Sequence, residues 1–510
     1  MGFFYDRERT DPMTTMTNNE RDLRLTMLNT LLTTPHRQLG ALWGVHDELS
    51  RQDPRFYVRL AAWYADTGDV RDHREMFVVS LATSPFPGHR DVGLALLRDL
   101  PPYQVGRVVD FISGRKKTVK APGGEPAVQE TGLFRTVPRS LRTEVTRYLR
   151  EREADAEWFD STVLTARKAV KRLYALLHVK PGERAQKVLF DGAPPAGSRL
   201  FALKELSKAD NPTAQARAIV AHAIPYRVAV AVLKQVTPPV LAALIDRMTP
   251  QEVINNVGSL RRRGALDNAD LKALVERKLA EAKTDGRVSA YKATVAAKAV
   301  GAAPELAKAL TDVTDSRVKA KGRVTRSTAL LLDKSGSMDV ALEVGKQLGA
   351  LVSAVCEADL YAYAFDNIAY PLETTGKQVA DWEAALLGIK AGGGTSCGVA
   401  IDWMAKKKQR VEQFVFVTDE GENGAPLFAD AYKTYVAALG VKPTVTIVKV
   451  GQATEQLETA CKQLGVPYNV FEFRGDYYAL PNVIPLLAQA SQTDLLMEIL
   501  SYPLPAREVT

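Results

Sequence analysis

The sequence predicts a two-part fold, an α-helical repeat array followed by a doubly wound α/β domain. Short amphipathic helices follow one another over residues 21–322, whereas apolar strands alternate with helices over residues 323–510. The two parts also differ in net charge. The 510 residues allow two to four domains, and 46% hydrophobic with 25% charged residues is ordinary for a chain that folds in water.

The first part shows apolar residues at spacings of three and four, which is the period of a helix packed on one face. This spacing predicts helices over residues 55–66, 143–153, 161–177, 239–248 and 271–283. Turns such as Asn211-Pro212 and Thr249-Pro250 separate successive helices. Helical hairpins in series are typical of a HEAT or armadillo solenoid, although no repeat consensus aligns and a globular helical bundle stays open.

Two segments depart from this pattern. Residues 1–20 mix charged and polar residues without an apolar signal core, and we expect a disordered N-terminal segment and no secretion. Residues 113–136 are rich in Gly, Pro and Lys, which predicts a long basic loop without regular structure.

In the second part, the apolar segments are too short for helices and lie between helical segments. Strands are predicted over residues 328–333, 359–365, 414–418, 443–450 and 468–473. Helices are predicted over residues 340–356, 377–389, 430–439 and 455–464, with others before 410 and at the end of the chain. Apolar strands with helical crossovers indicate a parallel sheet whose functional loops follow the carboxyl ends of the strands.

The charge is distributed unevenly. Residues 323–510 hold 16 Lys and Arg against 22 Asp and Glu, a net charge of −6, so the whole-chain value of +8 leaves +14 for residues 1–322. Such asymmetry favours a polyanion-binding module, and nucleic acid is the commonest cytoplasmic polyanion. Solubility alone is the alternative explanation. The three widely spaced cysteines argue against a disulfide scaffold and fit a reducing cytoplasm.

Oxygen-bearing side chains gather where three predicted loops meet. The turn after the first strand carries Asp333, Ser335 and Ser337, a later glycine-rich loop carries Thr395, and the FVFVT strand ends at Asp419. Two carboxylates and three hydroxyls suit a hard divalent cation, Mg²⁺ first and Mn²⁺ as the alternative. A lone DxSxS would instead be consistent with a helix N-cap. No histidine follows position 222, so Ser335 has no imidazole base in its own domain.

A basic segment stands out in the first part. Lys168, Lys171 and Arg172 recur at helical spacing, and His178 and Lys180 follow just before a proline. These side chains could bind RNA phosphates. The alternative is a surface helix whose cations stabilise its carboxyl end through the helix dipole.

The order of these features resembles the Ro ribonucleoprotein family, which joins a TROVE module to a von Willebrand factor A domain. The matching segments are RFYVRLAAWYADTGDVRD at 55–72, LLHVKP at 176–181, INNVGSL at 254–260, DKSGSM at 333–338, GGGTSC at 392–397 and FVFVTDEGENG at 414–424. The acidic and hydroxyl residues named above match the metal-ion-dependent adhesion site of A domains. We identify the chain as resembling a bacterial-type or phage-type homologue.

The resemblance implies a ring of HEAT-like helices closed by the A domain. We expect a cytoplasmic protein and favour a monomeric ring, while the sequence leaves the oligomeric state open. It implies small noncoding, Y-like RNA on the outer basic surface, and single-stranded 3′ ends of misfolded RNA in a central hole. Arg261, Arg262 and Arg263, placed after a turn containing Asn256, are candidates for the inner contacts. A role in RNA quality control, with an exoribonuclease as candidate partner, follows from the same resemblance.

A second class of function stays open. No catalysis, membrane contact or DNA binding is expected under the RNA-binding hypothesis. The rival is a metal-dependent protein-interaction scaffold without RNA binding, in which the A domain captures a partner's carboxylate through the metal.

Overall fold

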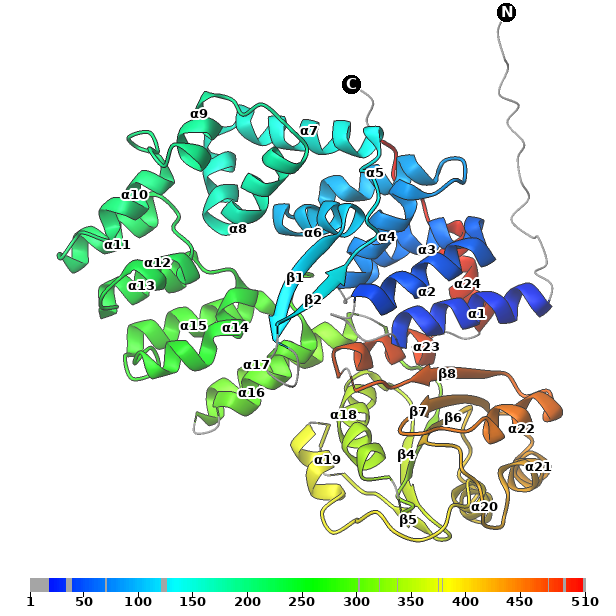
Figure 1. Cartoon of the computed structure of the whole chain (residues 1–510). Helices are drawn as coiled ribbons and strands as arrows, with labels where there is room; N and C mark the ends of the chain where they lie inside the picture. The colour runs from blue at the N-terminus through cyan, green and yellow to red at the C-terminus, as the bar shows by residue number, and fades with distance from the viewer. Residues whose placement is uncertain are drawn as a thin grey trace, which may run out of the picture.

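A computed structural model describes residues 18–507, except for 34–38, 69–70, 121–125, 301–302, 321, 337, 375, 378, 476 and 489–491. The segment expected to be disordered, residues 1–20, therefore lies almost entirely outside the described residues. Along the chain, the last helix of the first part ends at Lys319 and the first strand of the six-stranded sheet begins at Thr328 (Figure 1). Within the described residues, every helix is too short or too polar to span a bilayer.

The first half of the helical part contains nine helices among the described residues. They are α1 (Asn18–Thr33), α2 (Leu39–Gln52), α3 (Pro54–Thr67), α4 (Arg71–Thr83), α5 (His89–Asp99), α6 (Pro102–Ser113), α7 (Arg139–Ala154), α8 (Ala156–Leu176) and α9 (Glu183–Ala185). Helix α9 continues into a π-helical turn, Gln186–Phe190. The second half comprises α10 (Arg199–Leu206), α11 (Pro212–Ala221), α12 (Tyr226–Val232), α13 (Pro238–Arg247), α14 (Pro250–Arg262), α15 (Ala269–Ala282), α16 (Ala290–Val300) and α17 (Pro304–Lys319).

The packing of these helices distinguishes a solenoid from a globular bundle. Many helices contact the second helix along the chain: α2 on α4, α4 on α6, α6 on α8, then α11 on α13, α13 on α15 and α15 on α17. Stacked hairpins produce this pattern because each pair buries its apolar face against the next pair. The described helices therefore form the predicted repeat array, which curves from α1 through α8 to α17 (Figure 1).

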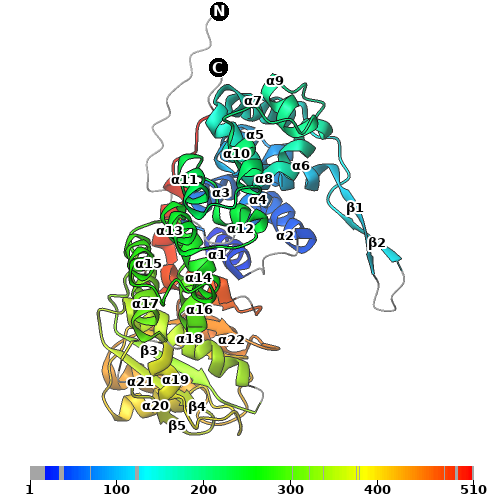
Figure 2. The same cartoon turned by 90° about the vertical axis from the view of Figure 1, so that its left-hand side faces the viewer.

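Segment 113–136 corrects the sequence analysis, because it is not an irregular loop. Strand β1 (Arg115–Lys120) pairs antiparallel with β2 (Pro126–Thr131), and the resulting hairpin projects from the array (Figure 2). Two backbone bonds anchor its base on α6, from Leu133 N–H to Phe111 O and from Arg135 N–H to Ile112 O. Lysine-rich strands without apolar alternation hid this hairpin from a periodicity argument.

The α/β domain holds a six-stranded sheet in the order β5-β4-β3-β6-β7-β8. Its strands are β3 (Thr328–Asp333), β4 (Leu360–Phe365), β5 (Ala369–Pro371), β6 (Gln413–Thr418), β7 (Thr444–Lys449) and β8 (Tyr468–Glu472). All neighbouring pairs are parallel except β4 with β5, a short edge strand that the sequence analysis missed.

Helices cover both faces of this sheet, as a doubly wound fold requires. The helical elements of this part of the chain are α18 (Asp339–Val355), α19 (Val379–Ala385), α20 (Val399–Lys406), α21 (Phe428–Leu439), α22 (Gln456–Leu464), a 3₁₀ turn η2 (Tyr477–Asn482), α23 (Val483–Ala488) and α24 (Gln492–Ser501). The apolar side chains of β3 separate by face. Ala329 and Leu331 belong to a cluster within the domain, whereas Leu330 and Leu332 belong to a core that extends into the first helices of the array.

The two ends of the array meet the α/β domain, which closes the ring. Helix α17 packs on α18, while α1 packs on β8 and α24, and α24 packs on α3. Polar contacts fix the second junction: Trp63 Nε1 donates to Glu498 at 2.9 Å, and Tyr502 donates to Asp66 at 2.5 Å. Farther along, Arg507 forms an ion pair with buried Glu144 at 2.8 Å. The C-terminal segment thus runs back along the start of the array.

Candidate metal site and nucleic-acid interface

The predicted metal site begins where two neighbouring parallel strands end. Strands β3 and β6 pair so that Leu332 lies opposite Val417, which places Asp333 beside Thr418. The Thr418 hydroxyl donates to Asp333 Oδ2 at 2.6 Å, and the Ser335 amide donates to Asp333 Oδ1 at 2.8 Å. Both carboxylate oxygens therefore have fixed directions, which follow from strand register.

Asp333 carries a charge that its surroundings disfavour. Its side chain is buried, and burial raises the pKa of the carboxyl; the hydrogen bonds from Thr418 and Ser335 oppose this rise, while the charge of Asp419 adds to it. A cation bound here would offset the cost of burying the Asp333 charge beside a second carboxylate, that of Asp419. The structure thus brings Asp333, Ser335 and Asp419 to one edge of the sheet.

The glycine-rich loop brings Thr395 to the same edge. Gly392 N–H donates to Lys334 O at 2.7 Å, and Gly336 N–H donates to Gly393 O at 3.3 Å, so this loop lies against the turn after β3. Gly393 adopts φ 92°, and a Cβ there would approach Asp366 Oδ2 to 3.0 Å, so this position requires glycine.

Asn423 links Thr395 to the loop after β6, a role that the sequence analysis did not assign. The Asn423 side-chain oxygen accepts from Thr395 N–H at 2.8 Å, and Asn423 N–H donates to Thr395 O at 2.9 Å. The sequence signal was its position, five residues after the carboxyl end of a buried strand. Thr395 itself is buried.

The donor set fits a hard divalent cation, since it consists of carboxylate and hydroxyl oxygens. Ser337 lies outside the described residues. No three His, Cys, Asp or Glu side chains converge as a metal-binding group anywhere in the described residues, so this site offers two carboxylates and no third such ligand. A bound cation would therefore depend on Asp333 and Asp419 together with the hydroxyls of Ser335 and Thr395 and with water.

Lys334 is part of this site, although its position in an exposed turn suggested a solvated side chain. Its ammonium forms an ion pair with Asp366 at 2.5 Å and donates to Gly392 O at 3.2 Å. Both side chains of the pair are about one-tenth exposed, with 11% for each. Asp366 directly follows β4, so it belongs to the same edge of the sheet as Asp333. Lys334 thus connects the turn after β3 to the loop after β4 and to the glycine-rich loop.

The predicted RNA-binding residues of the first part lie on α8 and the turn after it. Lys168, Lys171, Arg172, His178 and Lys180 are all exposed. The ammonium of Lys171 lies over the ring of Phe190, 5.1 Å from its centroid. His178 adopts a left-handed backbone, φ 52°, just beyond the helix end. Exposure of these five side chains is compatible both with RNA binding and with the alternative of an ordinary surface helix.

The projecting hairpin adjoins this segment through one carboxylate. Asp110 on α6 accepts from Arg172 of α8 and forms an ion pair with Arg115 of β1 at 3.1 Å. Arg115 and its neighbour Lys116 are about 59% and 66% exposed. Asp110 thus brings Arg115 and Arg172 together, and we group the exposed cations of α8, of the turn after it and of the hairpin base under the name α8–hairpin surface: Arg115, Lys116, Lys168, Lys171, Arg172, His178 and Lys180.

The three arginines predicted for the inner contacts do not follow a turn that contains Asn256, as the sequence analysis expected. Asn256 lies inside α14, where its side chain donates to Glu252 O at 2.8 Å, and not in a turn. Arg261 and Arg262 end α14, and Arg263 follows it. All three are exposed, but Arg261 also donates to Val300 O at 2.8 Å and so connects α14 to the end of α16.

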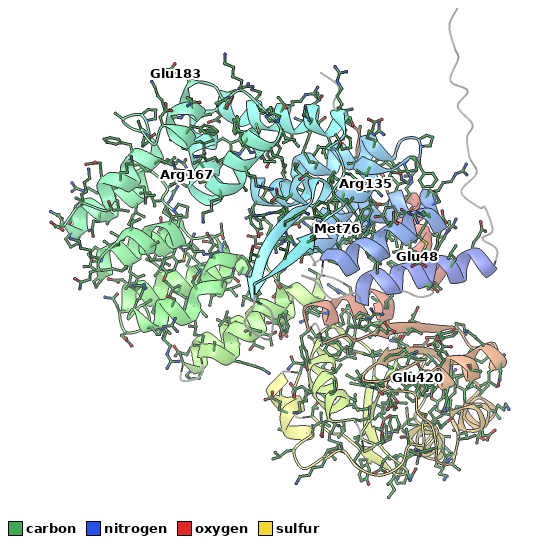
Figure 3. The ribbon with its side chains drawn as sticks, in the orientation of Figure 1. Glu48, Met76, Arg135, Arg167, Glu183 and Glu420 are labelled. Atoms are coloured by element: carbon green, nitrogen blue, oxygen red, sulfur yellow. The ribbon has the colours of Figure 1, made fainter. Side chains whose placement is uncertain are left out.

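The two candidate sites lie at opposite ends of the molecule. Glu420, next to Asp419, lies within the α/β domain, whereas Glu183 of α9 lies at the far side of the array (Figure 3). The views in Figures 1 and 2 agree on this separation of α8 and α9 from the α/β domain. Metal binding and any RNA contact at the α8–hairpin surface are therefore separable by mutation.

Fold and site together define a class of protein, a helical-repeat ring closed by an α/β domain with loops of the von Willebrand A type. The chain shares this fold with the crystal structure of the Deinococcus radiodurans Ro (RSR) protein. The two agree with a TM-score of 0.62 at 17% identity, over 92% of this chain and 99% of that one. At this identity the likeness establishes the fold alone.

A second structure, a von Willebrand factor type A protein from Catenulispora acidiphila, aligns over 34% of this chain and 43% of its own. Its TM-score is 0.25 at 16% identity, which is too low to support an argument. No protein-family model and no curated protein matches the sequence.

Proposed function

We propose that the protein is a non-catalytic RNA-binding scaffold of Ro type. The observation that carries this proposal is the α8–hairpin surface, a group of exposed cations within a part of the chain whose net charge is +14 by the count given above. Exposed Lys and Arg bind RNA phosphates and release counterions, which gives a salt-dependent affinity largely independent of sequence. The motifs quoted in the sequence analysis and the shared ring fold support the same function.

The proposed ligands are small, Y-like noncoding RNA on the α8–hairpin surface and single-stranded 3′ ends of misfolded RNA at the ring. Arg261, Arg262 and Arg263 are the proposed contacts for such ends. A role in cytoplasmic RNA quality control, with an exoribonuclease as partner, belongs to this proposal. Its first test is the purified full chain: we expect copurifying nucleic acid and binding of single-stranded RNA at low salt.

The metal has a separate role in this proposal. Mg²⁺, or Mn²⁺ in its place, would be held by Asp333, Ser335, Thr395 and Asp419, and Ser337 is the remaining predicted ligand. The cation would neutralise the buried carboxylates and leave an open coordination position at the edge of the sheet. Acidic groups of a partner protein are the natural ligands for that position.

The rival proposal is a protein-interaction scaffold without RNA binding. It rests on the open coordination position of the metal, which a partner's acidic group would fill. Negligible copurifying nucleic acid, together with no binding of single-stranded RNA at low salt, would favour the rival. Binding that weakens steeply with salt would favour the RNA scaffold.

A further inference from the structure

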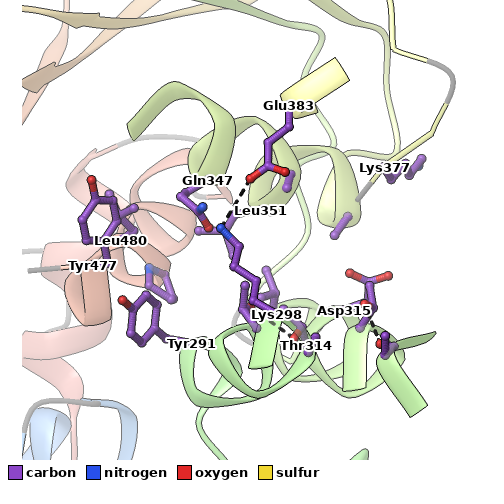
Figure 4. Close-up of a pocket in the computed structure, with 18 of the residues that line it drawn as sticks. Tyr291, Lys298, Thr314, Asp315, Gln347, Leu351, Lys377, Glu383, Tyr477 and Leu480 are labelled. Atoms are coloured by element: carbon purple, nitrogen blue, oxygen red, sulfur yellow. Dashed lines mark hydrogen bonds and ion pairs between the residues drawn. The ribbon is translucent and has the colours of Figure 1, made fainter. Parts of the chain in front are cut away.

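A cavity of about 520 Å³ lies at the junction between the helical array and the α/β domain. Helices α16 and α17 line it from the array, and α18, η2 and residues around α19 line it from the α/β domain (Figure 4). This volume is within the range of sites for small organic molecules, and junctions between domains are common places for them. Nothing in the proposed RNA or metal function uses this cavity.

The cavity has an apolar, aromatic end. Tyr291 of α16 and Tyr477 of η2 face each other with ring planes 13° apart and centroids 6.4 Å apart. Leu480 lies beside them (Figure 4), and Leu351 and Ala307 are further apolar side chains of the lining. Flat apolar molecules bind to such walls because aromatic faces offer large contact areas at fixed orientation.

Among the other lining side chains, the charged ones include more cations than anions. Lys298, Lys308 and Lys377 line the cavity together with Asp315 and Glu383. Lys298 is paired with Glu383 at 3.4 Å (Figure 4). Among the described residues, no carboxylate forms an ion pair with Lys308 or Lys377 within 4.0 Å. The cavity therefore offers two ammonium groups against the single remaining carboxylate of Asp315.

We propose that this cavity binds a small organic anion with a flat apolar body. The body would lie along the tyrosine end, and the anionic group would be held by Lys308 and Lys377. Such a ligand touches the last helices of the array and the α/β domain at once. Its binding therefore stabilises the junction that closes the ring, independently of RNA binding.

The aromatic sulfonate 8-anilinonaphthalene-1-sulfonate is a suitable probe, because its fluorescence rises in apolar sites. With the full chain we expect saturable binding of one probe per chain and a higher unfolding temperature. The double variant Lys308→Ala and Lys377→Ala should lower the affinity for the probe about threefold or more, since two charge contacts are lost. Lys442→Ala, an exposed lysine of the α/β domain outside the cavity, is the matched control and should change nothing.

An uncharged probe and a cavity-filling variant test the charge contacts and the location of the site separately. The uncharged analogue N-phenyl-1-naphthylamine should bind the native chain and the double lysine variant equally. Ala307→Trp fills the cavity and should abolish binding of both probes; if that variant does not fold, the double lysine variant decides alone. Probe affinity unchanged by the lysine substitutions, or equal losses in the Lys442→Ala control, would overturn the proposal.

Discussion

Arg172 of α8 is held by Asp110 of α6, and the same carboxylate also pairs with Arg115 of the projecting hairpin. Asp110 is largely buried, whereas both arginines remain substantially exposed. The carboxylate therefore orders two guanidinium groups on one surface and neutralises part of their charge. Phosphate binding to either arginine must compete with Asp110.

The first prediction concerns the cations of α8. Lys171→Ala combined with Arg172→Ala should weaken binding of a structured RNA and lower the slope of log affinity against log salt by about one per lost contact. Fluorescence anisotropy across a salt series measures both. Lys442→Ala with Arg410→Ala removes the same charge from exposed positions of the α/β domain and is the control. An unchanged slope in a folded variant would leave α8 as an ordinary surface helix.

The second prediction concerns Asp110. Asp110→Asn removes the negative charge that competes with phosphate, so affinity for structured RNA should rise a few-fold and the salt slope should become steeper. The triple variant with Arg115→Ala and Arg172→Ala should lose this gain, because the released arginines cause it. Anisotropy across a salt series measures both the affinity and the slope. Equal affinity of Asp110→Asn and the native chain would show that these arginines do not contact RNA.

The third prediction concerns the metal. Asp333→Ala should abolish binding of Mg²⁺ and Mn²⁺, since it removes one of the two predicted anionic ligands, while RNA binding persists because the sites lie at opposite ends of the molecule. Titration calorimetry with each ion, beside RNA anisotropy, measures the two functions. Asp430→Ala, at an exposed position of α21, is the control. Loss of RNA affinity with metal binding intact would contradict this division.

The fourth prediction concerns buried Glu75 of α4, whose pKa burial raises from 4.5 to about 8, with Asp72 adding to the rise and Arg107 opposing it. Between these values the unfolded chain ionises its carboxyl while the folded protein keeps it protonated. The free energy of unfolding therefore falls as pH rises from about 4.5 to about 8, by up to about 1 kcal/mol per pH unit.

Glu75→Gln keeps the neutral side chain and should lose this part of the pH dependence. Chemical denaturation of both proteins at pH 5 and pH 8 isolates the effect, because the other titrating groups cancel in the comparison. A native chain and a Glu75→Gln variant with the same pH dependence would show that Glu75 is ionised in the folded state.

The sequence could predict the sheet and most of the helices because their signals are local. TALLLD and FVFVT each contain an apolar run that ends in a polar residue, as expected for strands buried on both faces, and β3 and β6 lie where expected. The predicted metal ligands after β3 and β6 could be placed together from the sequence, because the carboxyl ends of neighbouring parallel strands lie at the same edge of a sheet. The sequence, which has no repeat consensus, left a solenoid and a globular bundle as alternatives. The packing of α2 on α4 and of α13 on α15 shows that the helices form a solenoid.

The remaining features depend on contacts between distant segments. The β1–β2 hairpin is stabilised by strand pairing and by its anchor on Phe111, not by an apolar pattern of its own. Lys334 is buried only because Asp366 and Gly392 reach it from other loops. The guanidinium of Arg172 is likewise held and partly neutralised by Asp110, which lies 62 residues earlier in the chain. No spacing rule within one segment could reveal these pairs.

The preferred form of RNA tests the central claim, RNA binding by a ring, most directly. A ring that admits one strand but not an A-form duplex selects free single-stranded ends, whereas an open basic surface favours the denser charge of a duplex. In competition at matched length and salt, a duplex with a single-stranded 3′ overhang should bind more tightly than a blunt duplex or a circular RNA. Equal affinities for the overhang and blunt forms would contradict the account.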